Sequence, residues 1–247
     1  MNFRLSSLVL SSLLAACGTN SASTGISTSS DSANDAINGG AADSGDPAVG
    51  LLWLGSGFCS GTLIAPNVVL TAGHCIHGET VEGFYIGKGK ATSVNTFDGP
   101  PANTTRYAAL AQAADPKYVA SETQCPNQTL DVALVKIEPV TSVKPLTYAT
   151  GTDYSVNEKC TAIGFGQHGS TVEAKRKATE IVTDATSSSV NVTKGSGITA
   201  QGDSGGPLLC GSNIVGVTSC GDGASFTAYG RVDSASSWIA AQVKAWK

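Results

Sequence analysis

Short apolar segments, separated by turn-forming residues, recur along the chain between residues 48 and 232. They are rich in Val, Ile and Thr, and Gly, Pro and Asn interrupt them, which is typical of strands in an antiparallel sheet. The pattern therefore predicts an all-β fold. The segments read AVGLLWL, GTLIA, VVLTA, GFYIG, DVALVKI, CTAIGFG, TEIVTDA, SVNVT, GPLLC, NIVGVTS and FTAYGRV.

Two local patterns add detail to this prediction. Pro66-Asn67 lies between GTLIA and VVLTA and predicts a hairpin turn. Near the C-terminus, apolar residues repeat at i, i+4 and i+7 behind two residues that can cap a helix. One amphipathic helix should therefore close the chain. The apolar residues are Ile239, Val243 and Trp246, and the candidate caps are Asp233 and Ser234.

The first residues have the features of an export signal. Arg4 supplies a positive charge, and an apolar run at residues 5–14, too short to span a bilayer, follows it. Residues 14–17, LAAC, resemble a bacterial lipobox, which implies acylation of Cys17 after removal of residues 1–16. An ordinary signal peptide is the alternative. Residues 17–36 are then a tether or propeptide, poor in apolar residues, before a folded domain at 37–247.

Composition narrows the function classes. Charged residues make up only 14% of the chain, the net charge is −4, and no long basic run is present, so we expect no nucleic-acid partner. Seven cysteines leave six besides Cys17, an even number for an exported protein. Three disulfides are therefore expected rather than a metal site, although six cysteines allow 15 pairings.

Three segments together carry candidate chemistry: LTAGHC, DVALVKI and GDSGGPL. They supply His74, Asp131 and Ser204, in that order along the chain. Serine-dependent peptide hydrolysis needs a hydroxyl nucleophile, a neutral imidazole to accept its proton, and a carboxylate that fixes the imidazole tautomer. Each segment alone has a structural explanation as a glycine turn, a disulfide-flanking loop or a strand cap. Their joint presence favours a hydrolase.

With CSGTLI and IGFG also in place, the chain from Ile37 to Lys247 resembles the trypsin and chymotrypsin family of serine proteases. The resemblance implies two antiparallel six-stranded β-barrels with a C-terminal α-helix. It also implies a serine endopeptidase without cofactors, acting as a monomer on protein or peptide substrates and open to protein inhibitors. The membrane would be contacted only through a lipidated precursor. Such an enzyme would be exported, anchored at first to the cell envelope, and then released outside the cell or into the periplasm.

The resemblance assigns roles to individual residues. It makes Ser204 the nucleophile, His74 the general base and Asp131 the residue that orients His74. The backbone N–H groups of Gly202 and Ser204 should form the oxyanion hole. Ser219 matches the position whose hydroxyl supports the buried aspartate.

A second resemblance concerns activation. Ile37-Asn38-Gly39-Gly40 is similar to the N-terminus that this family exposes when its zymogens are cut, here between Ala36 and Ile37. The freed ammonium should then pair with Asp203. A simple linker turn is the alternative. The same cut would separate the enzyme from Cys17, so we hypothesise that activation and release are one event.

The resemblance also guides the disulfides and the specificity pocket. It pairs Cys59 with Cys75 and Cys160 with Cys210, which leaves Cys125 and Cys220. We predict that these two form a bridge across the substrate groove; two buried thiols are the alternative. For the pocket it assigns Ile198, Thr199, Ser219, Gly221 and Thr227. An uncharged base at Ile198 and a wall narrowed by Thr227 favour small or medium aliphatic side chains, as in elastases; a larger apolar specificity is the alternative.

Other functions remain open on the sequence. His74 and His77 could form an HxxH metal pair, but no acidic cluster lies nearby, and His168 is expected in a loop. Lys88 and Lys90 occupy the region where the family carries calcium ligands, so no metal is expected. A binding module with a protease fold, an esterase and a glutamate-specific peptidase are the competing classes. Thr218, where the last of these usually has histidine, argues against it.

Overall fold

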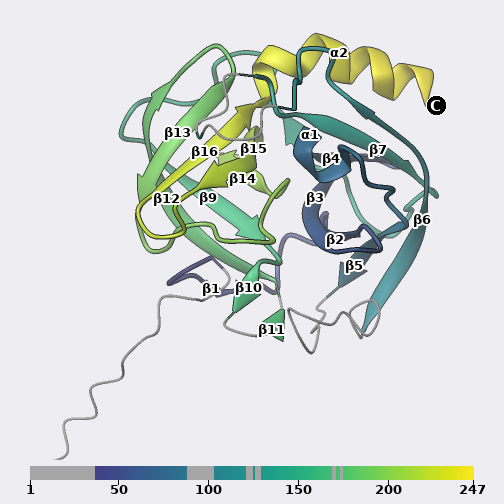
Figure 1. The fold of residues 1–247 in the computed structure, drawn as a ribbon, viewed down its shortest axis with the longest axis horizontal. Helices are drawn as coiled ribbons and strands as arrows, with labels where there is room; N and C mark the ends of the chain where they lie inside the picture. Colours follow the sequence, from purple (N-terminus) through teal and green to yellow (C-terminus); the bar gives the residue numbers. More distant parts are fainter. Residues whose placement is uncertain (1–36, 88–102, 121–124, 126–128, 169–170, 173–174) are drawn as a thin grey trace, which may run out of the picture. The chain divides into compact units, whose positions relative to one another are not determined.

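A computed structural model describes residues 37–87, 103–120, 125, 129–168, 171–172 and 175–247. All of them belong to one compact unit, Ser32–Lys247. This unit contains two closed six-stranded antiparallel β-barrels, as the sequence predicts. Figure 1 shows the first barrel in blue to teal and the second in green to yellow.

The first barrel closes in the order β2-β3-β4-β7-β6-β5. Its hairpin between β3 and β4 turns at Pro66-Asn67, as expected. The buried apolar residues of its strands form one cluster, and Val232, Ala235 and Ile239 of the C-terminal helix belong to the same cluster. The strands are β2 (Val49–Trp53), β3 (Phe58–Ala65), β4 (Val68–Thr71), β5 (Gly83–Gly87), β6 (Thr104–Ala114) and β7 (Ala133–Ile137).

The second barrel runs in the order β12-β13-β16-β15-β14-β9 and closes where β9 pairs with β12. Two short strands, β1 (Ala41–Ala42) and β8 (Thr147–Tyr148), pair with β12 and β15 at its edges. The six barrel strands are β9 (Lys159–Gly164), β12 (Arg176–Ala185), β13 (Ser189–Lys194), β14 (Pro207–Cys210), β15 (Asn213–Gly221) and β16 (Phe226–Arg231). A separate ribbon consists of β10 (Gln167–His168) and β11 (Thr171–Val172).

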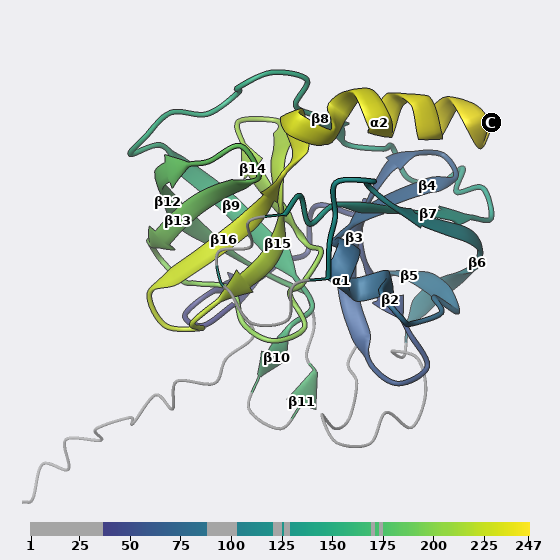
Figure 2. The same cartoon turned by 45° about the horizontal axis from the view of Figure 1, so that its top comes forward.

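Two helices complete the domain. The short α1 (Gly73–Ile76) follows β4, and α2 (Val232–Ala245) follows β16. Figure 2 shows α2 extending from the second barrel across to the first, where the Asn67 side-chain amide donates to the Trp246 carbonyl oxygen at 2.9 Å. Among the described residues, no helix has the length and apolar character that crossing a bilayer requires.

Two details differ from the sequence prediction. Strand β6 was not predicted, because its sequence TTRYAALAQAA is rich in alanine and lacks the alternation of a half-buried strand. The helix α2 begins at Val232, two residues earlier than a cap at Asp233 allows and three earlier than a cap at Ser234 allows. Its N-cap is Arg231, which makes no side-chain capping hydrogen bond, and Asp233 lies in the first turn.

Candidate active site

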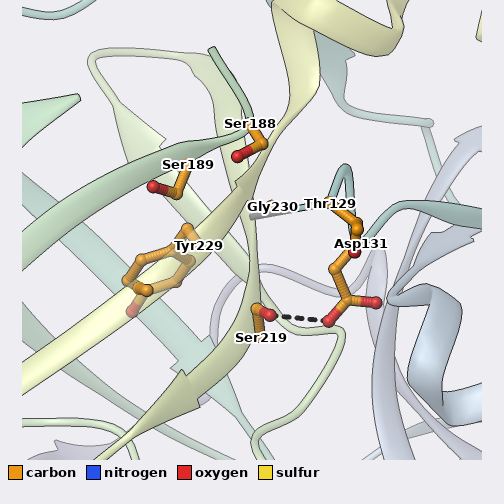
Figure 3. Close-up of a pocket in the computed structure, with 8 residues that line it drawn as sticks. Thr129, Asp131, Ser188, Ser189, Ser219, Tyr229 and Gly230 are labelled. Carbon is orange, nitrogen blue, oxygen red and sulfur yellow. Dashed lines mark hydrogen bonds between the residues drawn. The ribbon is translucent and has the colours of Figure 1, made fainter. Parts of the chain in front are cut away.

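A histidine of the first barrel and a serine of the second converge on one buried carboxylate. His74 Nδ1 lies 2.7 Å from Asp131 Oδ2, and the His74 backbone N–H donates to Oδ1 at 2.9 Å. The Ser219 hydroxyl donates to Oδ2 at 2.6 Å, a bond drawn in Figure 3. The two carboxylate oxygens of Asp131 therefore fix both the backbone and the ring of His74.

Asp131 is fully buried. Burial by itself raises the pKa of this carboxyl, but the hydrogen bonds from His74 and Ser219 outweigh it, and the pKa lies below its usual value. Asp131 is consequently ionised at neutral pH. An ionised carboxylate at this position favours the tautomer in which His74 Nδ1 carries the proton and Nε2 can accept one.

Two glycines allow the backbone around this carboxylate to approach closely. A Cβ on Gly73, the residue before His74, would lie 2.7 Å from Tyr118 Cγ and 3.0 Å from Asp131 Oδ1. A Cβ on Gly230, in β16 of the second barrel, would lie 2.3 Å from the Asp131 carbonyl oxygen. Both positions therefore need glycine, and Gly230 brings the second barrel against the segment that carries Asp131.

Ser204 lies in a tight turn between β13 and β14 that packs on the first barrel. The Ser60 backbone N–H donates to the Ser204 carbonyl oxygen at 2.7 Å, and the Ser60 hydroxyl donates to the Gly202 carbonyl oxygen at 3.1 Å. Ser60 follows Cys59, whose disulfide partner Cys75 follows His74. The sequence analysis did not single out Ser60, because only the folded structure shows its contacts with the turn.

The turn itself depends on two glycines with left-handed backbone conformations. Gly202 has φ +92°, and a Cβ there would lie 2.5 Å from Phe58 Cε2. Gly205 has φ +78°, and a Cβ there would lie 2.1 Å from Thr71 Oγ1 and 3.1 Å from the Ala72 nitrogen. Ser204 is thus seated beside the segment that leads from β4 into His74.

The predicted activation residues are also in contact. The Ile37 nitrogen donates to Asp203 Oδ2 at 3.1 Å, and both residues are completely buried. Burial raises the pKa of Asp203 to about 6, although N–H groups of Ala200, Gly166 and Ile37 act in the opposite direction. Asp203 therefore lies next to Ser204 as a buried acid. Within the part of the chain that the structure describes, its oxygens accept from neutral backbone N–H groups, and the charge of Arg176 also lowers its pKa.

Three consecutive basic residues, Lys175 just before β12 and Arg176 and Lys177 at its start, hold the segment that follows Ile37. Lys175 Nζ lies 3.1 Å from Asp43 Oδ2 and 2.7 Å from the Gly45 carbonyl oxygen, while Arg176 donates to the Gly40 carbonyl oxygen. Lys177 Nζ lies 3.0 Å from Asp43 Oδ1. Burial alone raises the pKa of Asp43, but the two lysines lower it below its usual value. The sequence analysis missed this basic cluster, whose partners are distant in the chain.

The residues assigned to the specificity pocket lie together in the second barrel. Thr199 Oγ1 and Thr227 Oγ1 are hydrogen-bonded at 2.7 Å, and both residues are buried. A Cβ on Gly221 would lie 3.1 Å from Thr227 Oγ1. The Thr227 side chain therefore reaches from β16 to both Thr199 and Gly221. Ile198 is completely buried, and Ser219 has its hydroxyl on Asp131.

Three disulfides surround this region. Cys59–Cys75, Cys125–Cys220 and Cys160–Cys210 are bonded, the same pairs that the family resemblance and the remaining two cysteines led us to expect. Cys125 is exposed, and Cys220 follows Ser219 in β15. The Cys125–Cys220 bridge thus ties the segment before Asp131 to the edge of the pocket.

Several other candidates lie elsewhere. His77 is exposed, and its ring meets Tyr118 edge-on with centroids 6.0 Å apart. The cysteines near His74, and those near Glu158, are disulfide-bonded and so offer no thiolate to a metal. His168 lies in β10, not in the expected loop. Cys17, Ala36, Lys88 and Lys90 fall outside the described residues.

Two antiparallel barrels, with a histidine, an aspartate and a serine brought to their junction in that chain order, define the class of two-barrel serine endopeptidases. The family model described as Trypsin matches residues 37–239, and the chain belongs to this family. The resemblance seen in the sequence is thereby confirmed.

Two curated relatives extend the comparison. A trypsin from Saccharopolyspora erythraea is 28% identical over 187 residues, which cover 68% of this chain and 78% of the relative. The Mus musculus kallikrein 1-related peptidase b3 is 28% identical over 214 residues, which cover 73% of this chain and 78% of the relative. As a protease of this family the chain acts on proteins or peptides, and its disulfides are consistent with export.

Proposed function

We propose that this endopeptidase hydrolyses peptide bonds through an acyl-enzyme on Ser204, with His74 as general base and Asp131 as the residue that orients it. The bond of 2.7 Å between His74 Nδ1 and Asp131 Oδ2 carries the proposal. The buried, ionised carboxylate orients the ring and favours the tautomer in which Nε2 can accept a proton, as a general base requires.

In the first step Ser204 Oγ attacks the scissile carbonyl carbon while its proton passes to His74 Nε2. The tetrahedral intermediate then expels the amine, which takes the proton from His74 and leaves an ester on Ser204. Water attacks this ester in the same way, which releases the acid and restores the hydroxyl. The N–H groups of Gly202 and Ser204 stabilise the oxyanion, a role that the left-handed conformation of Gly202 supports.

An organophosphate serine reagent tests this assignment. The form that begins at Ile37 should gain one adduct, located on Ser204 by mass spectrometry, and Ser204→Ala should remove it. Ser60→Ala is the matched control. Ser60 lies against the same turn, but its hydroxyl is buried and hydrogen-bonded to the Gly202 carbonyl oxygen, so it is not the nucleophile. An adduct on another serine, or none on a folded protein, would make the chain a binding module rather than an enzyme.

For specificity, we propose cleavage after small or medium uncharged residues. Thr227 reaches across to Thr199 and Gly221, which supports a shortened pocket, and Ile198 supplies no charge at its base. A pocket with this lining rejects long and basic side chains because they cannot be accommodated without displacing the Thr199–Thr227 pair. Peptides that differ only in the residue before the cut bond measure this preference.

We propose further that cleavage between Ala36 and Ile37 activates the enzyme. Asp203 and the Ile37 nitrogen already lie 3.1 Å apart, and an ammonium there would neutralise the buried carboxylate. Ile37 also has φ +38°, which a β-branched residue rarely adopts. A cut before Ile37 removes that torsion. Lys175, Arg176 and Lys177 hold the segment that follows Ile37 in place.

The same cut supports a proposal for localisation. If Cys17 is the lipid-bearing residue of an exported precursor, only the precursor is anchored, and the active monomer leaves the membrane and becomes accessible to substrates and to protein inhibitors. Fractionation of expressing cells should recover precursor in the membrane fraction and active enzyme beginning at Ile37 in the soluble fraction. Cys17→Ser should move the precursor to the soluble fraction. Active enzyme with Ile37 at its terminus that stays with membranes would contradict the proposal.

A further inference from the structure

One charged residue faces the interior of the second barrel. Along β12, every second residue from Ala178 to Val182 is buried, and the middle one is Glu180. Glu180 is completely buried, next to the apolar cluster that includes Ile198 and Val192. A carboxyl group in such an interior is costly unless its oxygens are hydrogen-bonded, so its partners show what it holds in place.

Both oxygens of Glu180 have partners that belong to, or adjoin, the proposed specificity pocket. Oε1 accepts the backbone N–H of Thr199 at 2.9 Å, and Oε2 accepts the Tyr229 hydroxyl at 2.6 Å. Tyr229 is completely buried, and burial raises the pKa of its hydroxyl while the nearby Thr199 side chain acts in the opposite direction. In Figure 3 its hydroxyl points away from Asp131, so it serves the pocket and not the candidate catalytic residues.

These bonds connect Glu180 to the Thr199–Thr227 pair. Glu180 fixes the backbone of Thr199 directly and the Tyr229 hydroxyl beside it, and the Thr199 hydroxyl is hydrogen-bonded to Thr227 at 2.7 Å. The neighbouring Ala200 N–H donates to Asp203 at 2.9 Å. The N–H groups of Thr199 and Ala200 are therefore bonded to two different buried carboxyl groups, those of Glu180 and Asp203. The loop that bears Thr199 is also bonded to the segment after Ile37, because the Ile198 N–H donates to the Asn38 carbonyl oxygen at 3.0 Å.

The charge state of Glu180 agrees with a positioning role. Burial raises the pKa of this carboxyl to about 8, against the effect of the bonds from Tyr229 and Thr199, and the nearby Asp203 raises it further. The buried position therefore favours the uncharged acid over the carboxylate. Buried polar networks of this kind add little stability compared with apolar packing, but they impose one arrangement of the side chains that they join.

We propose that Glu180 is a positioning residue that decides the substrate specificity: it holds Thr199 and Tyr229 so that the Thr199–Thr227 pair closes the pocket to longer side chains. The proposal rests on the function proposed above, because it concerns the pocket of that same enzyme. Glu180 need not contact the substrate. Its effect passes through Thr199.

The test uses the enzyme that begins at Ile37 and a peptide series in which only the residue before the cut bond varies, from Ala through Val and Leu to Phe. Wild type should prefer Ala and Val. Glu180→Leu removes both acceptors at similar volume, and Tyr229→Phe removes one bond only. Each should raise the ratio of kcat/KM for the Leu peptide to that for the Ala peptide by about tenfold or more, through KM as well as kcat.

Three controls separate positioning from general damage. Glu180→Gln keeps a carbonyl oxygen for the Thr199 N–H and should retain the wild-type ratio within about threefold. Glu82→Leu replaces an exposed acid of the first barrel and should change nothing. Thr227→Ala opens the pocket directly and should shift the ratio in the same direction as Glu180→Leu.

Two results would overturn the proposal. One is a folded Glu180→Leu enzyme whose Leu-to-Ala ratio of kcat/KM equals that of wild type. If Glu180→Leu does not fold, the same result with Tyr229→Phe overturns the proposal. The other is a Thr227→Ala enzyme that selects like wild type. Neither result resembles failure of the proposed function, which would appear as wild type that cleaves none of the peptides and takes no organophosphate.

Discussion

Replacing His74 by alanine should lower kcat for a peptide substrate by a factor on the order of a million, the loss found when the general base of a serine protease is removed. Without the imidazole Ser204 loses its proposed proton acceptor, and the hydroxyl is a poor nucleophile on its own. Thermal stability should change little, because the His74 side chain is 35% exposed. The measurement is kcat for the form that begins at Ile37, with its N-terminus checked by mass spectrometry.

The chain supplies a matched control for this experiment. His77 lies three residues later, is exposed, and contacts only the edge of Tyr118 among the ring contacts described. His77→Ala should keep kcat within about twofold of wild type. If both variants lose activity to a similar degree, a shared metal site would explain the data better than a general base at His74.

Replacing Asp131 by asparagine should lower kcat about ten-thousandfold, as in other serine proteases with this change. The backbone N–H of His74 donates to Oδ1, so the amide oxygen must occupy that position. The amide NH₂ then faces His74 Nδ1 at the site of Oδ2 and forces Nδ1 to be an acceptor. The ring proton moves to Nε2, which can no longer take a proton from Ser204.

This prediction separates tautomer control from simple loss of structure. The variant should fold with a melting temperature close to wild type, since both side-chain positions still hydrogen-bond and Ser219 can accept from the new NH₂ group. Ser219→Ala, which removes only the third partner of the carboxylate, should cost far less activity than the asparagine. An Asp131→Asn enzyme within about tenfold of wild-type kcat would show that His74 keeps the required tautomer without the carboxylate.

The fold could be predicted from sequence where side-chain pattern and structure agree. Short Val- and Thr-rich runs marked all the barrel strands except β6, because most of those strands are buried along nearly their whole length and carry β-branched residues between turns. Strand β6 was not predicted because its sequence is rich in alanine and has few of the β-branched residues that mark the other strands. Its place is set by pairing with β5 and β7, and that pairing depends on residues far away in the chain.

The sequence by itself determined the chemistry that this protein can carry. The types and order of His74, Asp131 and Ser204, with Gly202 before the serine, specify the groups of a serine protease, because the chemistry needs those side chains wherever the chain places them. The sequence also showed that six cysteines besides Cys17 are present to form disulfides.

Only the tertiary structure decided which groups meet. The seating of the Ser204 turn on Ser60 and Thr71, the hold of Lys175 on Asp43, and the bonds of Glu180 behind the pocket all join residues more than ten positions apart. Such contacts leave no local pattern, since hydrogen bonds and ion pairs depend on distances that exist only after the two barrels have closed.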